Sequence, residues 1–143
     1  MDHHLVALVI RWIHVGAMAT LLGGALLLAW LAARGPHGAI VDVAARYEQV
    51  FWAGLGVVVL TGVGNLGAFG LALPAPSTTW GGTFGLKMLS VVALVALSLP
   101  RSLIVARLQR GAGAPADPMR SLYTATAGLL AAIAAMAVWL AHG

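Results

Sequence analysis

A few polar side chains interrupt otherwise apolar stretches of this sequence, and they are the first candidates for chemistry. Arg11, His14 and Met18 recur at spacings of three and four residues, which places them on one face of a helix. An imidazole can bind haem iron or copper through a ring nitrogen, and the thioether of Met18 is a soft ligand suited to Cu(I). The structural alternative for His14 is a hydrogen bond to a neighbouring helix.

Lys87 and Met88 open a later apolar stretch and form a second group of candidates. The ammonium group of Lys87 suits an anionic partner such as a haem propionate or a quinone headgroup, or it could carry a redox-linked proton. Its alternative role is that of a lysine extending to the membrane interface. Asn65 is expected at the same level of the membrane, and with Thr61 it is expected to bond across helices.

The amino terminus offers a separate set of nitrogen ligands, His3 and His4. Met1-Asp2-His3 has the form of an amino-terminal Cu(II) site, in which the terminal amine, two backbone nitrogens and the imidazole make a square-planar set. The alternative is a polar tail that binds no metal. Further along, Lys87, Ser90, Ser98 and Arg101 form a polar stripe that could face a helix-bundle interior, and Arg101 is otherwise expected to extend to the cytoplasmic surface.

The elements that must position these residues are membrane spans. Of the 143 residues, 61% are hydrophobic and only 8% are charged, a composition typical of an integral membrane protein. Four apolar stretches approach or exceed the ~20 helical residues that a bilayer core requires. The expected spans are residues 5–33, 50–71, 83–106 and 121–140, with a short amphipathic segment at 42–49. The sequence thus predicts an all-α four-helix transmembrane bundle, with residues 1–143 forming a single domain.

Basic residues predict the orientation of this bundle. Five arginines fall on the side that holds the first and third loops: Arg34, Arg46, Arg107, Arg110 and Arg120. Because lysine and arginine favour the cytoplasmic side, both termini are predicted on the outer side of a bacterial cytoplasmic membrane. His14 and Lys87 then lie toward the outer face. The glycine-rich second span is expected to pack closely within the bundle.

The residues and motifs that the sequence lacks, together with the placement of its charges, exclude several function classes. The chain has no cysteine, which removes thiolate metal sites, iron–sulfur clusters and disulfides. The formal net charge of +4 comes mostly from arginines beside the spans, so it indicates topology rather than nucleic-acid binding. Neither a phosphate-binding loop nor the residue set of a hydrolase is present. The lipid bilayer is therefore the first expected partner.

Three short runs of sequence carry a family resemblance. They are Arg11-Trp12-Ile13-His14 with Gly23-Gly24, Leu60-Thr61-Gly62, and Trp80-Gly81-Gly82-Thr83-Phe84-Gly85-Leu86-Lys87. Together they resemble the membrane domain of the CopD (copper resistance protein D) family. The resemblance implies copper handling across the inner membrane, with His14 and Lys87 as a polar pair. The HemJ-type protoporphyrinogen oxidases look similar at the same points, and that similarity implies haem b.

Three interpretations follow. The first is a CopD-like membrane protein that handles copper at the outer face, with His14 as principal ligand and Met18, Met88, His3 and His4 as helpers. The second is a haem b electron carrier or oxidase, with His14 as axial ligand and Arg11, Lys87 and Asn65 around the cofactor. The third is a cofactor-free accessory subunit of a respiratory or photosynthetic complex. A homo-oligomer or a larger membrane complex would supply surfaces that so short a chain lacks.

Overall fold

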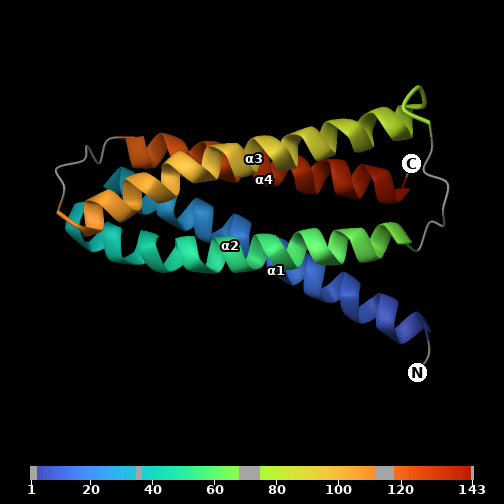
Figure 1. The fold of residues 1–143 in the computed structure, drawn as a ribbon, viewed down its shortest axis with the longest axis horizontal. Helices are drawn as coiled ribbons and strands as arrows, with labels where there is room; N and C mark the ends of the chain where they lie inside the picture. Colours follow the sequence, from blue (N-terminus) through green and yellow to red (C-terminus); the bar gives the residue numbers. More distant parts are fainter. Residues whose placement is uncertain (1–2, 35–36, 68–74, 112–117, 143) are drawn as a thin grey trace.

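The described residues of the computed structural model form four helices and no strand. The structure describes residues 3–34, 37–67, 75–111 and 118–142, and within these the side chains of residue 3, 37–39 and 64–67 are left aside. The helices are α1 (His3–Arg34), α2 (His37–Gly67), α3 (Thr79–Gln109) and α4 (Pro118–His142), as Figure 1 shows. Each is long and apolar enough to cross a membrane, which confirms the predicted all-α transmembrane fold.

The second helix starts earlier than the sequence predicts. The segment 42–49 was expected to precede the span, but α2 runs through it without a break, and the candidate span covers Ile40–Val63. The reason lies in the buried face of the helix, which continues at spacings of three and four through Ala44, Tyr47 and Phe51. Three charged residues lower the hydropathy here, Asp42, Arg46 and Glu48, and of these Glu48 is only 7% exposed.

Local signals explain both ends of α3. Thr78 lies in extended backbone before the helix, and its hydroxyl accepts a 3.0 Å hydrogen bond from the Gly81 amide, so it caps the first turn. At the other end Gly111 adopts a φ of +66°, and its amide bonds the Leu108 carbonyl at 3.1 Å. A glycine in this left-handed conformation is a common helix stop.

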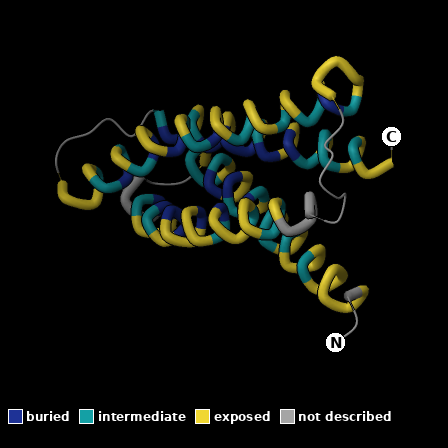
Figure 2. Tube along the Cα trace, turned by 45° about the vertical axis from the view of Figure 1, so that its right-hand side comes forward, coloured by how far each residue is buried: buried dark blue, intermediate teal, exposed yellow. Residues whose placement is uncertain are grey.

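The helices form two hairpins, α1–α2 (the first hairpin) and α3–α4 (the second hairpin), which lie side by side in Figure 1. One end of the bundle, here the arginine end, carries the connections between α1 and α2 and between α3 and α4. The other, the termini end, carries both chain ends. Apart from Gly81, no buried described residue lies within about the last nine residues of any helix at the termini end. The buried residues, dark blue in Figure 2, are concentrated toward the arginine end.

The first hairpin is fixed by a close approach between α1 and Tyr47. The Tyr47 hydroxyl donates a 2.7 Å hydrogen bond to the Leu21 carbonyl, and its ring packs edge-on against Tyr123 at 5.8 Å between centroids. Gly24 makes room for the ring: a Cβ there would lie 2.6 Å from Tyr47 Cδ2 and closer still to Cε2. Small residues of this kind let helix backbones approach in a membrane.

Gly24→Ala should therefore destabilise the fold by about 1–3 kcal/mol, because the buried Tyr47 ring is held by its own contacts and cannot move aside cheaply. The matched control is Gly23→Ala, where an added Cβ meets nothing within 4 Å and should be neutral or stabilising by up to ~1 kcal/mol. Reversible unfolding of both variants in mixed detergent–SDS micelles measures the difference. Equal stability of the two variants would contradict the packing argument.

Candidate functional site

His14 of α1 is joined to α2 by a hydrogen bond, as one of the two sequence interpretations predicts. Its Nδ1 lies 2.8 Å from the Thr61 hydroxyl. The Thr61 hydroxyl donates its own hydrogen to the Val57 carbonyl at 2.6 Å, so it must act as the acceptor toward the ring. This hydrogen-bond pattern assigns the proton of the neutral His14 ring to Nδ1.

This tautomer leaves His14 Nε2 as the ring's lone-pair donor. Among the described residues no group forms a hydrogen bond with Nε2. The ring edge rests near Gly62, where an added Cβ would be 3.6 Å from His14 Cε1. A histidine whose other nitrogen is held by a hydrogen bond has the arrangement usual for metal-ligating histidines, because that bond fixes both tautomer and ring orientation.

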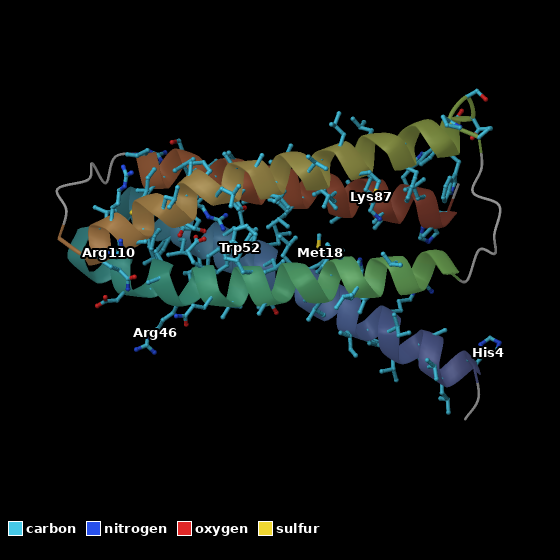
Figure 3. All side chains as sticks on the ribbon, viewed as in Figure 1. His4, Met18, Arg46, Trp52, Lys87 and Arg110 are labelled. Carbon is cyan, nitrogen blue, oxygen red and sulfur yellow. The ribbon has the colours of Figure 1, made fainter. Side chains whose placement is uncertain are left out.

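The other predicted ligands differ in how deeply they are buried. Met18, one turn along α1, is half-buried and packs against the edge of the core. Lys87 on α3 is half-buried. Figure 3 shows the labelled side chains of Lys87 and Met18 in the middle and termini-end part of the bundle. Met88 is 38% exposed, and Arg11 is also exposed.

The amino-terminal candidates lie away from His14. His4 is exposed and ten residues earlier in the same continuous helix, which separates the two by ~15 Å along the axis. They cannot ligate one ion together within a single chain. Met1 and Asp2 fall outside the described residues, and so do the side chains of His3 and Asn65, although both of these residues lie within helices.

In the described part of the chain no three His, Asp or Glu side chains gather closely enough to hold a metal ion. Around His14, the donor set that α1 presents is one imidazole nitrogen and one thioether sulfur. This set is incomplete for a closed structural metal site, which fills all coordination positions with protein ligands.

A second polar group, the Glu48 cluster, lies deeper toward the arginine end. It consists of Glu48, Trp52, Arg101, Ser102, Tyr123 and Thr126, from α2, α3 and α4. The Glu48 carboxylate accepts four hydrogen bonds: two from Arg101, from Nε at 2.8 Å and Nη2 at 3.1 Å, one from the Tyr123 hydroxyl at 2.8 Å, and one from Ser102. All the lone-pair directions of the carboxylate are thereby used.

Arg101 faces the bundle interior, as one of the two interpretations of the polar stripe predicts, and does not extend to the cytoplasmic surface as the other predicts. Its side chain is 1% exposed, and its Nη1 donates to the Thr126 hydroxyl at 2.7 Å. The guanidinium carbon lies over the rings of Phe51 and Tyr123, 4.2 and 5.1 Å from their centroids. A charge in this position is stable because an opposite charge, hydrogen bonds and aromatic faces replace its water.

The sequence interpretation recognised the polar stripe of α3 but not its partner on α2. Glu48 was assigned to an amphipathic connection, although it stands four residues after Ala44 and three before Phe51 on a continuous apolar face. A single carboxylate on such a face, with one arginine in another span, is the signal that points to a buried pair.

A known protein family matches most of the chain. The family described as Copper resistance protein D matches residues 41–140, which is more than half of the chain. The chain belongs to the CopD family. No curated protein and no solved structure matches it.

The residues that match the CopD family include one of the two polar groups completely and the other only in part. It contains the whole Glu48 cluster and also Thr61 and Lys87, but it begins after α1 and so does not include Arg11, His14 or Met18. The partner that orients His14 therefore lies inside the family match, while His14 itself lies outside it.

Arg101→Met should destabilise the protein by about 3–5 kcal/mol, because it leaves the Glu48 carboxylate charged and buried without its cation. Arg107→Met, at an exposed position of the same helix, is the matched control and should change stability by less than ~0.5 kcal/mol. The free energy of unfolding in SDS–detergent mixtures provides the measurement. The double variant Glu48→Met/Arg101→Met should recover most of the loss; a double variant as unstable as Arg101→Met would show that lost packing, not the unpaired charge, is responsible.

Proposed function

We propose that this CopD-family protein binds copper as its substrate at the termini end of the bundle, with His14 as the principal ligand. The observation that carries the proposal is the His14–Thr61 hydrogen bond, which presents Nε2 as a free lone-pair donor on a ring of fixed orientation. Family membership supports copper as the metal.

The donor chemistry favours Cu(I) as the bound ion. Met18 follows His14 by one helical turn on the same face, and a thioether is a soft ligand that prefers Cu(I). Met88 on α3 is the further sulfur donor in this proposal, while His3 and His4 form a separate entry site at the start of α1. So few protein ligands leave coordination positions open, which suits an ion that is passed on rather than stored.

The proposed orientation places this site outside the cell. Arg34, Arg46, Arg107, Arg110 and Arg120 are all exposed. Arg46 and Arg110 lie at the arginine end in Figure 3, while His4 lies at the termini end. Since arginines next to spans favour the cytoplasm, the proposed arrangement is a bacterial inner membrane with both termini and His14 toward the outer side.

Copper binding should be lost in His14→Ala and weakened about 10- to 100-fold in Thr61→Val, because the valine cannot accept the Nδ1–H hydrogen bond that orients the ring. Thr61→Ser retains a hydroxyl and should bind nearly as well as the wild type. The measurement is equilibrium competition for Cu(I) against a chromophoric chelator, using the purified full chain in detergent. His142→Ala, which removes an exposed histidine at the same end, is the matched control.

The same samples distinguish the other interpretations. A Soret band that disappears in His14→Ala would replace copper with haem b as the ligand of this histidine. Stoichiometric copper that persists in His14→Ala would overturn His14 as the principal ligand. A colourless protein that binds no copper, whether as wild type or as His14→Ala, would favour an accessory subunit.

A further inference from the structure

The polar contacts between the two hairpins are confined to one level of the bundle. In the described part of the chain, every hydrogen bond that joins the first hairpin to the second has Glu48 or Trp52 on one side. Their partners are Arg101, Ser102 and Tyr123. These contacts include the one ion pair that the described residues form.

Toward the termini end, hydrogen bonds hold each hairpin together internally instead. His14 bonds Thr61 within the first hairpin, and Trp80 Nε1 donates to the Leu140 carbonyl at 3.2 Å within the second. The described residues show no hydrogen bond between the hairpins at this level. In the described residues, the two hairpins therefore meet here mainly through apolar side chains. The chain also passes from α2 to α3 at this end, and α1 packs against α4 as well as against α2.

The apolar contacts at the termini end are only partly buried, and they include Met18, Val58, Val91 and Met136, which pack against the core. In a well-packed bundle, the residues that face the interior are buried along the whole length of each helix. Here no side chain is buried in residues 4–20 of α1, 56–63 of α2, 82–93 of α3 or 134–142 of α4. A region with few buried contacts opens at low free-energy cost.

The shape of α1 fits the same description. Its first half leans away from the other helices in Figures 1 and 2. Beside it is an apolar hollow of about 300 Å³, lined in the described residues by Leu5, Val6, Val9 and Ile10.

We propose that the Glu48–Arg101 pair is the pivot of a hinge motion in which the two hairpins tilt apart and together at the termini end. The four hydrogen bonds to the Glu48 carboxylate hold the two hairpins together at the arginine end, while the distance between the hairpins changes at the termini end. Thr61 lies 13 residues beyond Glu48 on α2, or ~20 Å along the helix, so a small tilt about Glu48 gives a large displacement at Thr61. A relative tilt of about 10° would move His14 and Thr61 by roughly 3.5 Å relative to Lys87.

This movement goes beyond the proposed copper function and does not depend on it. The two hairpins would open in metal-free protein, because the opening follows from where the polar ties and the buried contacts lie. Hinge motions of this kind around a fixed point are a common way to change access to a site.

Double electron–electron resonance on the metal-free full chain in lipid nanodiscs tests the proposal, since the cysteine-free sequence accepts labels only where cysteines are introduced. One pair, Val63→Cys with Leu86→Cys, spans the hairpins at the termini end. The other, Val43→Cys with Gln109→Cys, spans them at the arginine end. All four positions are exposed. We expect a broad or two-peaked distance distribution for the first pair and a single narrow one for the second. Equally narrow distributions would overturn the proposal.

The role of the ion pair is tested in the same labelled backgrounds. Glu48→Gln keeps the side-chain shape but removes the charge, and it should broaden the arginine-end distribution as well. Gln49→Ala, at the exposed neighbouring position, is the control and should leave it narrow. If Glu48→Gln does not fold, Ser102→Ala removes one of the four hydrogen bonds and should broaden the same distribution to a smaller extent. A distance distribution at the arginine end that stays narrow in the variant that folds would show that Glu48 is not the pivot.

Discussion

The buried pair of Glu48 and Arg101 is the constraint on which the rest of this bundle depends. Two charges in an apolar interior are tolerable only if nearly every hydrogen-bonding position is filled, and here none of the buried side-chain polar atoms in the described residues lacks a partner. Filling those positions requires groups from α2, α3 and α4 to meet at one point. The pair therefore fixes the rotation and depth of three helices at once.

The first helix is held in a different way, and this determines the character of the candidate copper site. α1 contributes no side chain to the Glu48 cluster; it contacts that region through the Leu21 carbonyl and the space at Gly24. Beyond these contacts, its polar tie to the bundle in the described residues is His14 with Thr61. In the described residues α1 packs against α2 and α4 but not against α3, so His14 is oriented by α2 and has no direct backbone contact that fixes its distance from α3.

The sequence alone was sufficient for the fold, because four long apolar stretches in a chain with few charges leave little choice except membrane helices. The cross-helix hydrogen bond of His14 was also predictable, since a polar group in a span needs a partner. The Glu48 cluster was missed for a physical reason. A carboxylate lowers local hydropathy whether it faces water or an arginine on another helix, and an arginine after Pro100 resembles an interfacial one. Which helices meet is a tertiary fact that periodicity in one chain does not contain.

The distribution of charge bears on which copper ion the proposed site would accept. The acidic side chains among the described residues are Asp42 and Glu48, both toward the arginine end of α2, so neither supplies negative charge at the proposed copper site. Coulomb repulsion from Lys87 is twice as large for a divalent ion as for a monovalent one at the same position. Imidazole nitrogen and thioether sulfur supply no negative charge in compensation. In the proposed site, a protonated Lys87 and the soft sulfur donor would both favour Cu(I) over Cu(II).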